Sequence, residues 1–509
     1  MRELRTCGLQ PLKTFPLRRL SGWKKAHALS LFFLATAIAL PAQTFTNLVS
    51  FDLSNGAAPS APLVQGLDGK LYGTTSSGGA NGLGTVFNIT VGGKLTTLYS
   101  FCSANSCPDG SNPFAGLALD TTGNFYGTTE NRGANGNGGT VFRITPTGTL
   151  ITLHSFCTLT NCSDGDMPAA GLVRATNGNF YGITTSGGAN GAGTVFKITP
   201  GGVLTTLYFF CAQSGCSDGK SPIGGLIQAT DGNLYGTTAS GGANSAGTVF
   251  KITPGGVLTT LYSFCTVTNC TDGQFPNAGL VQAADGNFFG TTLAGGASTS
   301  EFCGVVGFTE PCGTVFKITS QGILTTLYSF CAQTNCADGG LPLAPLVQAT
   351  DGNFYGATTR GGANGNGGTL FKINRAGTLT TLYSFCAQTN CADGNGPEAR
   401  LFEATNGIFY GTTLANGANL EGTVFSLSVG LGAFVETLPA SGKVGTTVKV
   451  LGNNLKGATQ VKFNGTAAAF TVVSGSYIKT SVPNGATMGF VTVTTPTGTL
   501  KSNTKFRPF

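Results

Sequence analysis

The stretch DGNLYGTTASGGANSAGTVFKI, residues 231–252, holds five glycines in 22 positions and returns in near copies along this 509-residue chain. The copies share one aromatic position, and successive aromatic residues lie 54 to 66 positions apart. A period of this length in strand-like sequence is typical of the blades of a β-propeller rather than of a helical solenoid. The sequence therefore predicts an all-β fold with a seven-bladed β-propeller, whose blades are centred on Tyr72, Tyr126, Tyr181, Tyr235, Phe289, Tyr355 and Tyr410.

Four strands are predicted within one copy. They are 225–230 (GLIQAT), 233–238 (NLYGTT), 247–253 (GTVFKIT) and 258–264 (LTTLYSF), which are short and rich in β-branched and aromatic residues. Asp231-Gly232 lies between the first two strands and is typical of a tight hairpin turn, because glycine tolerates the positive φ that such a turn requires. Each copy thus predicts one four-stranded up-and-down sheet.

The seventh copy is incomplete. It ends after GTVFSLSV, residues 422–429, and has no fourth strand, whereas residues 44–51 (TFTNLVSF) match the fourth strand TLTTLYSF at 378–385. If 44–51 pairs with the last copy, no sheet edge is left exposed where the ring closes. We therefore predict a propeller over 43–429 that is closed by its N-terminal strand.

The glycine-rich segment 240–247 (SGGANSAG) is not typical of a nucleotide site. Phosphate-binding loops lie between a strand and a helix, whereas this segment lies between two predicted strands and has no Lys-Ser/Thr pair after it. The glycines are better explained by the close approach of neighbouring strands and by backbone conformations that other residues avoid. We expect no cofactor.

Residues 1–42 differ from the rest of the chain. They contain seven of the 28 Lys and Arg residues, followed by the apolar run ALSLFFLATAIAL (28–40) and Pro41-Ala42. This order is typical of a secretory signal peptide, and the run is too short to span a bilayer. Because the signal carries so much positive charge, the remaining chain is close to neutral and does not indicate nucleic-acid binding. We expect an exported protein, extracellular or in the periplasm or cell envelope, without a transmembrane segment after the signal is removed.

Fourteen cysteines follow the signal, in seven pairs that are close in sequence. An even number of cysteines in an exported chain indicates disulfides. Zinc is the alternative, but zinc sites combine two close pairs or add histidine, and each pair here stands alone. The expected disulfides are Cys102–Cys107, Cys157–Cys162, Cys211–Cys216, Cys265–Cys270, Cys303–Cys312, Cys331–Cys336 and Cys386–Cys391.

The long loops of the predicted blades share one face. Alternation through four strands places both tight turns at one end and both long loops, with all the cysteine pairs, at the other. This loop-bearing face is the expected binding surface. Repeated loop asparagines such as Asn190 and Asn244 are candidates for recognition there. The charges that break the repeat are the other candidate ligand residues, namely Glu130, Arg132, Glu301, Glu310, Arg360 and Glu421.

Few residues suit catalysis or metal binding. His154 is the one histidine after the signal, and it stands where another repeat has Tyr262, so we expect a packed strand residue. The Asp-Gly pair after each cysteine pair, as at Asp218, is expected to cap the disulfide loop. Calcium is the alternative, and Asp164 with Asp166 comes nearest to a cation cluster. We therefore assign no catalytic, cofactor-binding or metal-binding residue.

The composition changes after the repeats. Residues 430–433 are expected to form a linker, and residues 434–509 contain eight Lys and Arg residues, one acidic residue and no cysteine. Short strand-like runs separated by turn residues, such as 446–455, are typical of a small immunoglobulin-like β-sandwich. Its basic surface is either a solvated face or a surface for an acidic polymer.

The repeats closely resemble the GloVer tandem repeat of exported bacterial proteins, over nearly all of residues 43–429, and their strand order resembles that of NHL-type blades. Residues 434–509, with GTTVKVLGNNL and VKFNG, resemble an IPT/TIG immunoglobulin-like domain. The repeat family implies no catalytic activity that can be carried onto residues of this chain.

These observations predict an exported, non-catalytic binding or structural protein that acts in envelope or extracellular recognition or adhesion. Its expected partner is an extracellular glycan or an envelope protein, and the chain is expected to be a monomer. The alternative is an extracellular propeller enzyme, a hydrolase or lyase of polysaccharides or lactones, that uses carboxylates at the channel mouth.

Overall fold

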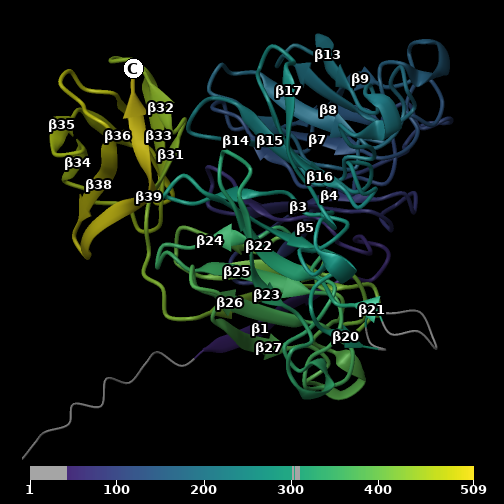
Figure 1. The fold of residues 1–509 in the computed structure, drawn as a ribbon. Helices are drawn as coiled ribbons and strands as arrows, with labels where there is room; N and C mark the ends of the chain where they lie inside the picture. Colours follow the sequence, from purple (N-terminus) through teal and green to yellow (C-terminus); the bar gives the residue numbers. More distant parts are fainter. Residues whose placement is uncertain (1–42, 301–302, 304–309) are drawn as a thin grey trace, which may run out of the picture. The chain divides into compact units, whose positions relative to one another are not determined.

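The computed structural model describes residues 43–300, 303 and 310–509, which belong to one compact unit of the chain. The expected signal peptide and Glu301 lie outside the described residues. The described part is almost entirely β-structure (Figure 1).

The opening stretch folds as an antiparallel sheet. Its strands are β14 (Ile227–Gln228), β15 (Leu234–Thr238), β16 (Thr248–Ile252) and β17 (Leu258–Ser263), in sequential order. The prediction for the first strand was too long, because only two of the residues 225–230 pair with β15. The preceding residues include Pro222, which has no backbone N–H to donate, and they run along the wall of a cavity described below.

Among the described residues, six further four-stranded antiparallel sheets repeat this arrangement. We call the seven sheets the repeat sheets. Five have sequential order: β2 (Val64–Gln65), β3 (Leu71–Thr75), β4 (Thr85–Ile89) and β5 (Leu95–Ser100); β6 (Ala118–Leu119), β7 (Phe125–Thr129), β8 (Thr140–Ile144) and β9 (Leu150–Ser155); β10 (Val173–Arg174), β11 (Phe180–Thr184), β12 (Thr194–Ile198) and β13 (Leu204–Phe209); β18 (Val281–Gln282), β19 (Phe288–Thr292), β22 (Thr314–Ile318) and β23 (Leu324–Ser329); and β24 (Val347–Gln348), β25 (Phe354–Thr358), β26 (Thr369–Ile373) and β27 (Leu379–Ser384).

The seventh repeat sheet joins the two ends of the repeat region. It contains β28 (Phe402–Glu403), β29 (Phe409–Thr413), β30 (Thr423–Ser428) and β1 (Thr44–Ser50), and β1 pairs antiparallel with β30 from Thr44 opposite Ser428 to Ser50 opposite Thr423. The structure therefore confirms the predicted pairing of the N-terminal strand with the last copy.

Aromatic and aliphatic side chains join each repeat sheet to the next. Tyr235 of β15 stacks on Phe288 of the following sheet with ring centroids 4.2 Å apart. The same contact recurs along the chain, and a further cluster joins Tyr410 of the last sheet to Leu71 of the first. The last repeat sheet therefore packs against the first, and the seven repeat sheets follow one another in a circular order.

The glycine at the centre of each second strand allows this packing. A Cβ atom on Gly236 would lie 2.7 Å from the ring of Phe250 and 2.9 Å from Leu226, closer than side chains can approach. The backbone there has no positive φ, so the requirement is for space. The glycine of the opening stretch therefore serves packing, in agreement with the sequence analysis.

Hydrogen bonds hold the long loops together at one end of the sheets. The amide of Gly242, in a glycine-rich loop, donates to the carbonyl of Cys216 at 2.9 Å, and the amide of Lys220 donates to Ser240 at 2.9 Å. We call the end that carries both kinds of loop the loop face. Its short 3-10 turns are η1 (Thr160–Cys162), η2 (Ser214–Cys216), η3 (Thr268–Cys270), η4 (Thr334–Cys336) and η5 (Thr389–Cys391), and the added hairpin of the fifth repeat is β20 (Thr299–Ser300) with β21 (Glu310–Pro311).

The C-terminal strands form two further sheets around a core that contains Val448, Ile478 and Val493 (Figure 1). The first sheet has the order β31-β33-β37-β36 and the second β32-β39-β38-β34-β35, with β32 parallel to β39. Their bounds are β31 (Glu436–Leu438), β32 (Ser441–Gly442), β33 (Thr447–Leu451), β34 (Gln460–Phe463), β35 (Thr466–Ala468), β36 (Phe470–Val472), β37 (Tyr477–Ser481), β38 (Gly489–Thr495) and β39 (Gly498–Pro508).

Three hydrogen bonds link these strands to the tight-turn end of the repeat sheets. The hydroxyl of Ser476 donates to the carbonyl of Leu67, and the guanidinium of Arg507 donates to the carbonyl of Thr230. The side-chain amide of Asn453 donates to the hydroxyl of Thr405. The three acceptors precede equivalent turns of three repeat sheets. No helix in the described part of the chain has the length and hydropathy of a membrane span.

Candidate functional site

Each repeat sheet begins with a five-residue segment of the pattern Pro-x-Ala/Gly-x-Leu. We call these the channel segments; they are residues 59–63, 113–117, 168–172, 222–226, 276–280, 342–346 and 397–401. The first, third and fifth positions repeat along the chain, while the second and fourth vary.

The repeated positions of the channel segments are used by the fold. The carbonyl of Ala278, at a third position, accepts a hydrogen bond of 2.9 Å from the hydroxyl of Thr237 in the preceding sheet. Thr74 and Thr128 make the same bond to Ala115 and Ala170. The leucine at the fifth position packs beneath the central glycine, as Leu226 does beneath Gly236. These contacts fix the position of each channel segment between its own repeat sheet and the preceding one.

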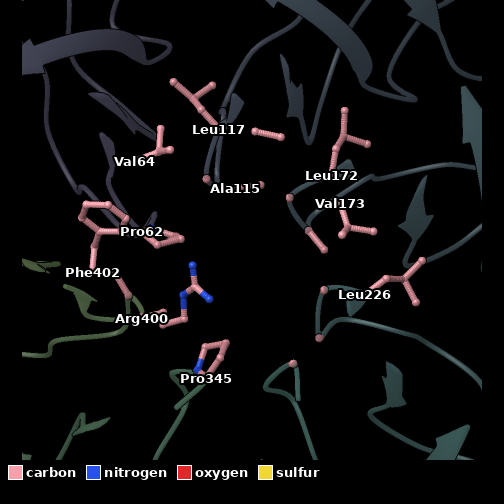
Figure 2. A pocket seen from close by; sticks show the side chains of 18 of the residues that line it. Pro62, Val64, Ala115, Leu117, Leu172, Val173, Leu226, Pro345, Arg400 and Phe402 are labelled. Carbon is pink, nitrogen blue, oxygen red and sulfur yellow. The ribbon is translucent and has the colours of Figure 1, made fainter. Parts of the chain in front are cut away.

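The varied positions all face one cavity of about 730 Å³ (Figure 2). A volume of this size is typical of small-molecule sites. The lining residues at the second positions are Ser60, Phe114, Ala169, Ile223, Asn277, Leu343 and Glu398, and those at the fourth positions are Pro62, Gly116, Gly171, Gly225, Gly279, Pro345 and Arg400. The residues that differ between the seven channel segments, which are distant in sequence, therefore lie around one cavity.

The cavity wall is mainly apolar. Figure 2 shows Leu117, Leu172 and Leu226 on one side of the space and Pro345 with Phe402 on the other. The second positions lie at the loop-face end of the cavity, since they precede the first strands, whereas Glu436, Leu438 and Leu451 of the C-terminal strands line the tight-turn end. Access from solvent is therefore expected from the loop face, past Phe114, Ile223 and Leu343.

Two carboxylates, Glu130 and Glu398, and two guanidiniums, Arg174 and Arg400, of the repeat sheets lie in this wall. Burial raises the pKa of the Glu130 and Glu398 carboxyls above their ordinary value. Burial lowers the pKa of the Arg400 guanidinium, and the field of Glu436 opposes that shift. The guanidinium of Arg400 projects into the open space (Figure 2).

The cysteine loops have a separate and repeated polar arrangement. One carboxylate oxygen of Asp218 accepts hydrogen bonds from the hydroxyl of Tyr208 at 2.8 Å and from the amide of Ala212 at 2.9 Å, and the other oxygen accepts from Gln213. His154 takes the place of the tyrosine in one repeat, with Nε2 3.2 Å from Asp164 Oδ2. The aspartates therefore cap the loops, as expected, and this accounts for His154 as a structural residue.

The calcium alternative gains no geometric support. Asp164 is bonded to the amide and hydroxyl of Thr158, and Asp166 accepts from the hydroxyl of Ser186. Among the described His, Cys, Asp and Glu side chains, the one group of three close enough to share a cation is Cys303, Cys312 and Cys331. All seven expected cysteine pairs are joined as disulfides in the structure, these three cysteines included.

The structure separates the predicted ligand residues. Glu130 lines the cavity, whereas Arg132 and Arg360 are exposed on the loop face outside its lining, and Glu421 is partly exposed there. Glu310 lies in β21. The loop asparagines serve the fold, since the side-chain amide of Asn244 donates to the carbonyl of Phe264 at 3.0 Å and Asn190 donates to Phe210.

Arg400, Glu398 and the other varied channel residues were missed by the sequence analysis. The signal was present as two varying positions within the otherwise repeated pattern Pro-x-Ala/Gly-x-Leu. It was overlooked because the fourth position fell at the start of the predicted first strand and the second position just before it, and charges were sought in the glycine-rich loops and in the insertion of the fifth repeat.

The model of the Gloeobacter/Verrucomicrobia repeat matches residues 34–163, 139–306 and 305–477, most of the chain. The chain belongs to the Gloeobacter/Verrucomicrobia repeat family. No protein among those with curated descriptions matches this repeat protein.

Several solved structures resemble this member of the Gloeobacter/Verrucomicrobia repeat family at low identity. The extracellular domain of a hybrid two-component system from Bacteroides thetaiotaomicron is 12% identical, with 92% of this chain and 59% of that chain covered and a TM-score of 0.47. An auxiliary nutrient-binding protein from the same organism is 12% identical, with 76% of each chain covered and a TM-score of 0.40. A protein described as an oxidoreductase (glucose dehydrogenase) from Thermus thermophilus is 14% identical, with 76% and 100% covered and a TM-score of 0.39. The chain spans less than two thirds of the first of these structures, and values this low assign no function to it.

Proposed function

We propose that this chain is an exported, non-catalytic binding protein, a seven-bladed β-propeller over residues 43–429 followed by an IPT/TIG-like β-sandwich over 434–509. It takes its ligand at the loop face, through the mouth of the central channel. The observation that carries the proposal is the placement of variation, because all fourteen varied positions of the channel segments line one cavity. The first, third and fifth positions of the channel segments, which make contacts within the fold, keep the same residue types. The second and fourth positions differ from repeat to repeat, as is typical of residues that contact a ligand.

Export is supported by the cysteine chemistry. Disulfides form and persist outside the reducing cytosol, and seven of them bridge the described cysteines. Six of the seven close loops of the same length on the loop face, so they stiffen the surface that surrounds the channel mouth. A stiff rim loses little conformational entropy when a ligand binds. We propose an extracellular glycan or an envelope protein as the partner of this rim.

One observation favours a second candidate function, an extracellular hydrolase or lyase of polysaccharides or lactones. Glu130 and Glu398 both line the cavity, and burial raises the pKa of both, which is the direction of shift that a general acid needs. We rank it second because the rest of the wall is mainly apolar and offers few groups to orient a sugar. Turnover of a β-linked or lactone substrate that is lost in both Glu130→Gln and Glu398→Gln would favour the enzyme.

The binding proposal is tested on a glycan array with the mature chain, residues 43–509. Ile223→Arg places a long charged side chain at the channel mouth, where Ile223 is 36% exposed, and should abolish retention of any glycan that the native chain holds. Val257→Arg is the matched control, because Val257 is 68% exposed in a tight turn at the opposite end of the same repeat sheet. Equal retention by the two variants, or no glycan retained by the native chain, would contradict glycan recognition through the mouth.

A further inference from the structure

Arg400 is the varied channel residue that the fold does not explain. The equivalent positions of the other six channel segments hold glycine or proline, so the repeat folds without a long side chain there. The guanidinium has no hydrogen-bond acceptor and no ion-pair partner among the described residues. It nevertheless projects into the cavity from the wall near Pro345 and Phe402 (Figure 2).

A guanidinium in such a place is costly unless an anion joins it. Five N–H donors lose water when the side chain is enclosed, and a charge without a partner is disfavoured in a region of low polarity. Glu436 is the charged group whose field reaches Arg400, but the two side chains form no ion pair. The guanidinium therefore retains its capacity to bind an anion.

The surroundings of Arg400 restrict the kind of anion. The fourth positions on either side of Arg400 are Pro62 and Pro345 (Figure 2). The other fourth positions are glycines, and leucines of the fifth positions, such as Leu117 and Leu226, line the cavity across from Arg400. Such a surface suits an apolar body and offers few donors for the hydroxyl groups of a sugar. Glu130, Glu398 and Glu436 line the same cavity as Arg174 and Arg400, so the wall has no excess of basic side chains that would favour a ligand with several negative charges.

We propose that the channel binds a monocarboxylate with an apolar body, whose carboxylate pairs with Arg400 while its apolar part fills the cavity between the channel segments. This inference rests on the proposed function in one respect, the use of the channel mouth as the way in from the loop face. A planar carboxylate matches the guanidinium fork with two parallel hydrogen bonds. The glycan or protein partner of the rim is a separate ligand.

The test is isothermal titration calorimetry of the mature chain with octanoate and with octanamide, which has the same length and a neutral head. We expect octanoate to bind about tenfold or more tightly than octanamide, as charge-assisted bidentate pairs do. Arg400→Gly, which restores the residue of four other channel segments, should bind both compounds equally weakly. Arg360→Ser is the matched control, since Arg360 is exposed outside the cavity lining and serine stands at the equivalent position of other repeats.

The outcomes separate this inference from the proposed function. Equal binding of the two compounds by the native chain, a preference for octanoate that survives in Arg400→Gly, or no binding of either compound would overturn the inference. None of these results changes the reading of the glycan array with Ile223→Arg and Val257→Arg. If Arg400→Gly does not fold, Arg400→Gln, which keeps a polar side chain and removes its charge, gives the same comparison.

Discussion

At the level of single residues, the same tyrosine–aspartate hydrogen bonds recur in several repeats. The hydroxyl of Tyr235 donates to Asp231 at 2.9 Å at the tight turn, and the hydroxyl of Tyr208 donates to Asp218 at the cysteine loop. Burial and the neighbouring carboxylates raise the pKa values of both tyrosines, which keeps them neutral and able to donate at any physiological pH. The sequence analysis predicted that Asp218 caps the cysteine loop, and its placement agrees.

Gly236 gives the sharpest test at this scale. Gly236→Ala should destabilise the protein by about 1–3 kcal/mol, because the new methyl group overlaps Phe250 and Leu226 in a packed interior. Gly255→Ala in the same repeat is the control, since its nearest neighbour is Thr253 Oγ1 at 3.8 Å and its φ is not positive. Urea unfolding monitored by circular dichroism measures both. Equal stability of the two variants would show that space is not what requires glycine at 236.

At the scale of elements, the second, third and fourth strands were predicted within a residue or two, because β-branched and aromatic residues between turn signals mark them clearly. The first strand was not, since residues such as 225–230 are as apolar as a strand, but only two of them pair with β15 and residues 225–227 line the cavity. The seam between β1 and β30 was predictable because a fourth strand was missing at one end of the repeats and present at the other.

The disulfides act on loops, so their reduction should spare the sheets. Each six-residue cysteine loop contributes about 2 kcal/mol in a chain-entropy model, and none of the seven bridges joins two strands of the repeat sheets. After reduction with a phosphine, we expect the far-ultraviolet circular dichroism of the mature chain to stay close to that of the oxidised protein while its melting temperature falls. Loss of the β signal on reduction at 25 °C would mean that the bridges hold the sheets together.

At the scale of the whole molecule, the cavity could not be read from the sequence. Most of its lining comes from the seven channel segments, which are spread between residues 59 and 401 and meet only because the repeat sheets follow a circular order. Glu130 was the one predicted ligand residue that the structure places in this wall. Charges in the long loops were a weaker guide, because loop positions such as Arg132 and Arg360 vary without facing a shared space.

The central claim is that the varied residues surround the place where a ligand binds. A crystal structure of the mature chain grown with octanoate tests it most directly. We expect density for the ligand inside the cavity, with its carboxylate within hydrogen-bond distance of the Arg400 guanidinium and its chain between the leucines of the channel segments. Octanoate bound only on the C-terminal strands or on the outer surface, with the cavity free of ligand, would contradict it.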